Sequence, residues 1–258
     1  MVARPGVNLG WTASLLLLFL SASGCGDPTA AMDAVFIDAG RARALTIQAM
    51  EAEHPDQRRA AINRLASSHH AGDANVVRAM DLIARSDHSP SARTAAVVAL
   101  GKADTSEACT AAAGLIPDEP ADLPANLHEA MRTELMRTLT ACAAGDHFEP
   151  AADERAFAAG SQVLRADPSR HARLEAARLL GYFPKPESLE TLIAGLEQRD
   201  FGVCYHAEAS LQRLTGQSFD HDPVAWRAYL AKTSDPFTSP TEEHPVSPAE
   251  RWFGWLTP

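Results

Sequence analysis

The segment Arg93-Thr-Ala-Ala96-Val97-Val-Ala-Leu100-Gly101 carries the pattern on which the fold of this chain depends. Its arginine is followed by a small or apolar pair three and four residues later, and by a leucine seven residues later. Residues with these offsets lie on one face of an α-helix. The segment therefore predicts an amphipathic helix. Gly101, and Gly181 in a later copy, are expected to take a positive φ and end that helix.

The pattern recurs along the chain, which indicates a repeat architecture. Its copies begin at Arg58, Arg93, Arg132, Arg173 and Cys204, where cysteine replaces the arginine. Successive copies are roughly 30 to 40 residues apart, a period that suits one pair of antiparallel helices per unit. The segments between the copies also have apolar residues at helical spacing and are expected to form the partner helices, over 39–53, 75–84, 106–116, 153–164 and 187–198. The proline-rich segments Pro117–Pro124 and Pro184–Pro186 are expected to be loops.

The composition excludes several classes of fold and partner. Apolar residues make up 46% of the 258 residues, but aromatic residues only 6%. Alanine, leucine and valine carry the apolar content, and a chain so rich in small and straight-chain residues excludes a β-sandwich or a barrel. The net charge of −10 argues against a phosphate backbone as a ligand. We therefore expect no nucleic-acid partner.

With these repeats the chain resembles HEAT-repeat proteins, and in particular the short bacterial repeats first noted in bilin lyases (PBS-lyase-like repeats). The resemblance covers about residues 39–231. It implies an all-α fold, an α-solenoid in which antiparallel HEAT-like helix pairs form a right-handed superhelix. We expect about five such pairs, closed by a capping C-terminal helix.

The end of the array carries a second motif of this resemblance. Leu214, Thr215 and Gly216, followed by Phe219, Asp222 and Trp226, are similar to the closing motif of many bacterial HEAT-repeat proteins. The resemblance implies a turn and then a helix that bears a tryptophan. We expect Asp222 to be the N-cap of this helix, and Phe219 and Trp226 to cover the apolar end of the last unit.

The repeat arginines have two interpretations. In HEAT-repeat proteins this arginine tends to pair with an acidic residue in the turn of its own or a neighbouring unit, and aspartates precede three of the arginines at Asp56, Asp87 and Asp167. These aspartates favour a ladder of local ion pairs. The alternative is a basic rail along the concave face that binds an anionic ligand. The acidic net charge favours the ladder, and charge reversal at Arg58, Arg93 and Arg173 is expected to test recognition through this face.

Residues 1–24 have the features of a secretory signal peptide: a basic start, an apolar run and then small residues. Ala22-Ser23-Gly24-Cys25 resembles a bacterial lipobox, which implies that Cys25 is acylated and begins the mature protein. Residues 25–38 are then a linker. Gly26 is not the aspartate associated with inner-membrane retention, so resemblance to Gram-negative lipoproteins implies a lipoprotein on the periplasmic side of the outer membrane. The alternative is an ordinary signal peptide followed by an unmodified cysteine.

The remaining cysteines lie in an oxidising compartment if the chain is exported. Cys109 is near the start of one predicted helix and Cys142 is at the end of its partner, so antiparallel packing brings them together. They are expected either to form a disulfide or to be two small core thiols. Cys204 is expected to be a buried and inert thiol.

No motif for catalysis or for metal binding is present in the sequence. It contains no His-Glu-x-x-His, no paired Cys-x-x-Cys, no glycine-rich phosphate loop and no Gly-x-Ser-x-Gly elbow. We therefore expect no catalytic residue, no bound metal and no cofactor.

These features predict a lipid-anchored, non-enzymatic HEAT-repeat scaffold that mediates protein–protein interaction at the cell envelope. Its partners would be an unidentified envelope protein and, through acylated Cys25, the lipid bilayer. The alternative is a HEAT-like enzyme or accessory factor, similar to bilin lyases, that acts on a small ligand. Residues 232–258 form a proline-rich extension with a Trp252-Phe253-Gly254-Trp255 end, which either folds back on the array or docks on a partner or membrane.

Overall fold

The computed structural model describes residues 37–237, and this part of the chain is helical and contains no strand. The predicted signal peptide, Cys25 and the aromatic end of the C-terminal extension lie outside the described residues. The helices are α3 (Ala39–Glu51), α4 (Pro55–Ala66), α5 (Ala74–Ser86), α6 (Pro90–Lys102), α7 (Ser106–Ala113), η1 (Pro120–Asp122), α8 (Leu123–Asn126), α9 (Glu129–Ala144), α10 (Pro150–Ala166), α11 (Arg170–Leu180), α12 (Pro186–Leu196), α13 (Phe201–Thr215) and α14 (Pro223–Leu230).

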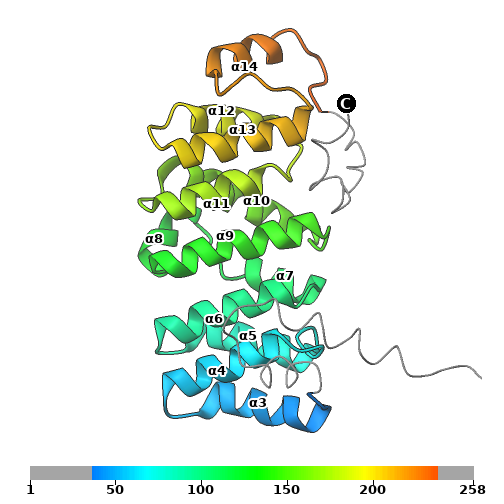
Figure 1. The fold of residues 1–258 in the computed structure, drawn as a ribbon, viewed down its shortest axis with the longest axis vertical. Coiled ribbons are helices and arrows are strands. Elements are labelled where there is room, and N and C mark those ends of the chain that lie inside the picture. Colours follow the sequence, from blue (N-terminus) through cyan, green and yellow to red (C-terminus); the bar gives the residue numbers. More distant parts are fainter. Residues whose placement is uncertain (1–36, 238–258) are drawn as a thin grey trace, which may run out of the picture.

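Ten of these helices pair into hairpins that stack in chain order, as Figure 1 shows. The hairpins are α3–α4, α5–α6, α7–α9, α10–α11 and α12–α13. Their first helices form one layer, the first-helix layer, and their second helices form the second-helix layer. The short helix α14 lies on α12 at the end of the row. The predicted all-α solenoid with a capping helix is confirmed.

The two layers differ in how closely their helices approach one another. Each second helix packs extensively on the next, whereas the contacts between successive first helices are sparser. A two-layer row bends toward the layer whose members are closer together. The open surface of the second-helix layer, here called the second-helix face, is therefore the inner side of the bend.

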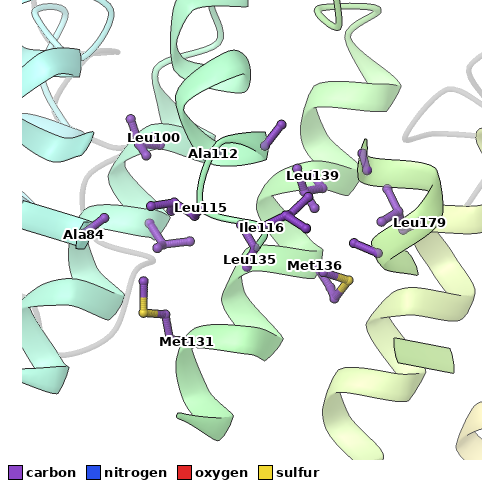
Figure 2. Packing of buried hydrophobic residues seen from close by; sticks show 14 of the residues in the cluster. Ala84, Leu100, Ala112, Leu115, Ile116, Met131, Leu135, Met136, Leu139 and Leu179 are labelled. Atoms are coloured by element: carbon purple, nitrogen blue, oxygen red, sulfur yellow. The ribbon is translucent and has the colours of Figure 1, made fainter. Parts of the chain in front are cut away.

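Each hairpin buries its apolar side against its neighbours in the row. Leu135, Met136 and Leu139 of α9 are fully buried. In Figure 2 they lie between Leu100 of α6 and Leu179 of α11, which belong to the units before and after. Because no hairpin covers this surface by itself, the stability of one unit depends on the presence of the next.

Local sequence determines where many of the helices begin. Proline occupies the first position of five α-helices in residues 37–237, where its fixed φ suits the helix and its missing N–H is not needed. These prolines are Pro55, Pro90, Pro150, Pro186 and Pro223.

No helix between residues 37 and 237 combines the length and apolar character that a membrane span requires.

The close approach of second helices explains two glycines. A Cβ at Gly101 would lie 2.8 Å from Thr138 Oγ1, and a Cβ at Gly181 would lie 2.7 Å from Ser210 Oγ. Both hydroxyls also donate to a carbonyl oxygen in the preceding unit, Thr138 to Val97 at 3.0 Å and Ser210 to Ala177 at 2.7 Å.

The expectation that these glycines take a positive φ was wrong. Gly101 lies inside α6, and Gly181 has a φ of −66°. Gly216 is the described glycine with a positive φ, of 68°. Gly101 and Gly181 are therefore explained by the lack of a side chain where a neighbouring helix passes, and not by backbone conformation.

The third unit departs from the regular pattern. Its first helix, α7, has only 8 residues, and the connection to α9 holds η1 and α8. The prediction of a plain loop over Pro117–Pro124 was thus incomplete. Leu123 is fully buried, and η1 packs on α10, so this insertion fills the space that the short α7 leaves.

We expect Gly101→Ala to destabilise the protein by about 1–3 kcal/mol, because the added methyl group overpacks the contact with Thr138. The double variant Gly101→Ala/Thr138→Ala removes the nearest atoms and should lose less stability than the sum of the two single variants. Urea unfolding followed by circular dichroism measures both effects. A Gly101→Ala protein as stable as the wild type would contradict the close approach of α6 and α9.

Candidate functional site

Arg58 joins two successive units. Its Nε and Nη2 donate to the two carboxylate oxygens of Asp87, at 2.7 and 2.8 Å, in the turn of the following unit. Its Nη1 donates to the carbonyl oxygen of Ala52, directly after α3, at 2.8 Å. The carboxylate of Asp87 also accepts the backbone N–H of Ser89 at 2.7 Å. One guanidinium thus donates to a carbonyl group at the end of the first helix of its own unit. It also binds the carboxylate that accepts a backbone N–H at the start of the second helix of the next unit.

Both members of this pair remain charged at neutral pH. The hydrogen bond to Asp87 raises the pKa of Arg58. Burial raises the pKa of Asp87, but the hydrogen bonds from Arg58 and Ser89 outweigh it and leave that pKa below its ordinary value of 3.8. Because the pKa of Asp87 is lower in the folded protein than its ordinary value, the pair stabilises the fold at pH values above 3.8. This stabilisation is lost as the pH falls through the lowered pKa.

The same arrangement recurs between the third and fourth units. Arg132 donates to both carboxylate oxygens of Asp167, at 2.7 and 2.9 Å, and to the carbonyl oxygen of Leu127. Asp167 accepts the N–H of Ser169 at 2.8 Å. The side chains of Arg132 and Asp167 are 6% and 0% exposed, so this pair is desolvated and its members depend on each other.

The other copies keep the geometry with different partners. Arg173 donates to the amide oxygen of Gln198 at 3.0 Å and to the carbonyl oxygen of Asp167 at 2.7 Å. Arg93 donates to the carbonyl oxygen of Ala84 at 2.9 Å. Cys204, in place of the arginine, directs its thiol to the carbonyl oxygen of Gln198 at 3.1 Å. In four of the five copies the polar group at this position reaches the end of the first helix of its unit, whereas Arg132 reaches Leu127, directly after α8.

Arg58, Arg132 and Arg173 thus join successive units, and Arg93 binds within its own unit, so the repeat arginines do not form an open rail. The carboxylates come from the following unit, so the expected local pairs of Arg58, Arg93 and Arg173 were wrong. Asp87 pairs with Arg58, Asp167 with Arg132, and Asp56 with Arg59. Charge reversal at Arg58 or Arg173 would break these unit contacts. It would therefore report on stability and not on recognition.

The closing motif forms the end of the array. Gly216 ends α13 in the left-handed conformation, and Asp222 is the N-cap of α14, with its carboxylate accepting two backbone N–H groups. Trp226 is fully buried, with its ring 4.8 Å from that of Phe219. Leu214 and Thr215 are buried beside them.

A buried carboxylate that the sequence did not reveal organises this cap. Glu208 of α13 accepts the indole N–H of Trp226 at 2.7 Å and the backbone N–H of Phe219 at 3.0 Å. Its side chain therefore fixes α14 on the last hairpin. No motif marks this residue, because its partners follow 11 and 18 positions later.

Two cysteines form a covalent link within the irregular third unit. Cys109 of α7 and Cys142 of α9 are joined in a disulfide, with their Cα atoms 5.7 Å apart. Cys204 is a free thiol, and burial raises its pKa above the ordinary value of 9.0. Reactive thiols have a lowered pKa, so this environment is that of an inert thiol.

The second-helix face carries a set of exposed cations. The residues five and nine positions after the repeat arginine, or after Cys204, point outward from this layer, and none of them is acidic. The basic residues among them are Lys102, Arg137, Arg178 and Arg213, and all four are exposed. The basic rail that was the alternative interpretation is therefore absent at the repeat arginines, but exposed cations lie one and two helical turns later.

Three of these cations line a groove of about 490 Å³ over α9, α11 and α13, here called the second-helix groove. Its other polar and aromatic lining residues are Thr140, Glu175, Tyr182, Tyr205, His206 and Ser210. Glu175 accepts from Arg137 at 2.9 Å and from Arg178 at 3.4 Å. The groove thus has three cations and one buried carboxylate.

The groove holds titratable groups, but their partners do not suit proton transfer. Burial, and then the charge of Arg178, lower the pKa of His206, so that its ring is neutral at pH 7. Glu175, its acidic neighbour, is already bound to two guanidinium groups. Within residues 37–237 no group of three or more His, Cys, Asp or Glu side chains is placed to hold a metal ion. The cations of the groove suit binding of an anion.

We expect Arg132→Met to cost about 3–5 kcal/mol of stability, because it leaves Asp167 charged and buried without a partner. Arg132→Met/Asp167→Asn should recover much of this loss, since asparagine keeps an acceptor for Ser169. Arg59→Met, which breaks an exposed pair, is the control and should cost less than about 1 kcal/mol. Equal losses for Arg132→Met and Arg59→Met in urea unfolding would contradict the role of the buried pair.

Comparisons with known proteins assign this chain to no family. No protein-family model matches the chain, and no curated protein matches it. Among solved structures it is similar to a designed armadillo repeat protein, with 13% sequence identity and a TM-score of 0.42, over 80% of this chain and 92% of that one. The helical-repeat part of the predicted resemblance is confirmed by the fold, and its assignment to the short bacterial HEAT repeats stays a prediction.

Proposed function

We propose that this protein is a membrane-anchored, non-catalytic scaffold that binds another protein of the cell envelope through its second-helix face. One observation carries the proposal. The five second helices form an uninterrupted surface, and the cations exposed on it are not the arginines that hold the units together. Stacked helix pairs commonly use such an extended inner surface to bind a partner.

The first-helix layer offers a less regular surface. Its third member, α7, is short, and the insertion with η1 and α8 follows it. Ile47, Met50 and Leu82 are exposed at the beginning of this layer. This small apolar area is the competing candidate for a partner, and the second experiment below compares the two faces.

The anchor is proposed from sequence. Acylation of Cys25 would attach the chain to the bilayer, since each buried CH₂ of an acyl chain contributes about 0.8 kcal/mol. Cys25 lies fourteen positions before Ala39, the first residue of α3. Covalent geometry allows this linker to span at most about 50 Å, so the array would remain close to the membrane surface. Gly26 supports the outer membrane as the site of attachment.

Metabolic labelling with an alkyne fatty acid tests the anchor. We expect the wild-type chain to incorporate the label and to sediment with membranes. Cys25→Ser should incorporate none and should leave the membrane fraction, because the acceptor thiol is gone. Cys204→Ser is the matched control and should behave like the wild type. A Cys25→Ser chain that is still labelled would contradict acylation at this residue.

Photo-crosslinking in cells tests the binding face. A photoreactive amino acid at Asn63, Ala141 or Ala209, all exposed on the second-helix face, should give a specific crosslink to another protein. The same probe on the first-helix layer, at Leu82 or Glu190, should give none.

Two patterns of crosslinks would contradict the proposed binding face. Crosslinks only from Leu82 and Glu190 would move the partner to the other face. An absence of crosslinks from every position, with the protein folded and at its native abundance, would remove the support for a scaffold.

A further inference from the structure

We propose that the second-helix groove binds an acidic peptide segment of the partner protein. The carboxylates of this segment would contact Arg137, Arg178 and Arg213, and an apolar side chain beside them would pack on Tyr205. This inference rests on the proposed function and deepens it, because it states which part of the face is used and what chemistry is recognised.

Two of the arginines are held in place by a carboxylate beneath them. Glu175 is 5% exposed and accepts from Arg137 with one oxygen and from Arg178 with the other. The guanidinium groups of Arg137 and Arg178 are each about half exposed. Arg137 is also bound by Glu134 at 2.7 Å, so two carboxylates orient it, whereas Glu175 alone orients Arg178 and leaves its other N–H donors free for the groove. An arginine whose fork is already oriented loses less conformational freedom when a carboxylate binds.

Arg213 is positioned by an aromatic ring. Its guanidinium carbon lies 4.6 Å from the ring centre of Tyr182. Stacking on a ring uses the face of the guanidinium and leaves its N–H edges available for a carboxylate. The groove thus presents three oriented arginines from three successive units.

Exposed aromatic side chains continue the groove at α13. Phe201 is 74% exposed and Tyr205 is 53% exposed, with their ring centres 6.4 Å apart. Large aromatic side chains in water are costly unless something covers them, and tyrosine and arginine are enriched in protein interfaces. This part of the surface therefore suits an apolar side chain of a peptide.

Charge distinguishes this groove from another hollow on the opposite side of the molecule. A hollow of about 640 Å³ over α5, α7 and α10 also contains three arginines. Each of those has its own partly or fully exposed acidic partner, in the pairs Arg78–Glu107, Arg85–Asp81 and Arg155–Asp118. In the second-helix groove the three arginines have two carboxylate partners, the lining Glu175 and Glu134, which pairs with Arg137 at 2.7 Å from beside the groove, so one positive charge remains in excess.

This excess lies on a chain whose net charge is −10. An acidic partner is repelled by most of the surface and attracted to this groove, which orients its approach. A small anion would use the arginines but not the aromatic surface of Phe201 and Tyr205. A peptide with carboxylates and one apolar residue uses both.

Fluorescence anisotropy on the full-length chain in mild detergent tests the inference. The probe is a fluorescein-labelled peptide rich in glutamate with one central tryptophan, and the matched probe has glutamine in place of every glutamate. We expect the glutamate peptide to bind, the glutamine peptide to bind at least about tenfold more weakly, and added salt to weaken binding.

Variants locate the binding. Arg213→Glu should weaken binding of the glutamate peptide by about tenfold or more, and Tyr205→Ala should weaken it severalfold. Arg199→Glu makes the same change of charge at an exposed arginine that does not line the groove, and should have little effect. Unfolding curves of all variants establish that they are folded. Equal effects of Arg213→Glu and Arg199→Glu would overturn the inference.

Competing ligands complete the test. Inorganic phosphate, single-stranded DNA and anionic lipid vesicles should each compete poorly with the peptide. Tighter binding of any of them than of the glutamate peptide would overturn the inference, as would equal binding of the glutamate and glutamine peptides.

Failure here is distinguishable from failure of the proposed function. Crosslinks from Asn63, Ala141 or Ala209 to a partner segment without acidic residues would keep the scaffold and discard the acidic peptide. Crosslinks from Ala209 to an acidic segment, lost in Arg213→Glu, would support both.

Discussion

The close packing of each second helix on the next is the constraint on which the rest of the structure depends. Small residues permit it: Gly101 and Gly181 leave space for Thr138 and Ser210, and those hydroxyls donate to carbonyl groups of the preceding unit. The same packing buries the leucines that no single hairpin covers. Because the first helices approach one another less closely, the row bends and one face becomes its inner side.

Polar groups at the ends of the helices follow from this packing. Where two units meet, the terminal carbonyl groups of one first helix face the turn of the next unit. The guanidinium of Arg58 donates both to such a carbonyl group and to the carboxylate of Asp87 in that turn. Burial of Arg132 and Asp167 makes their contact a requirement of the array and not an added surface pair. Since one set of arginines has this role, the exposed set at Arg137, Arg178 and Arg213 remains available for a ligand.

The third unit shows how the array tolerates a defect in the pattern. Its first helix is short, and three features compensate: the buried Leu123, the packing of η1 on α10, and the disulfide between Cys109 and Cys142. A disulfide that closes 33 residues typically stabilises a protein by about 2–4 kcal/mol. Stacking of the later units is thereby maintained, and with it the alignment of α9, α11 and α13 under the second-helix groove.

The sequence by itself determined the helices, their repetition and the closing turn, because these depend on spacings of three, four and seven residues and on single residues such as Gly216 and Asp222. It also placed Cys109 and Cys142 at helix ends that antiparallel packing brings together. Only the tertiary structure decided which aspartate Arg58 contacts, why Gly101 has no side chain, and that Glu175 and Glu208 are buried. These contacts join residues that lie 11 to 38 positions apart, so they depend on how one helix is placed on the next, which no local spacing encodes. The second-helix groove belongs to the same class, because its residues come from three units that meet only when the row is assembled.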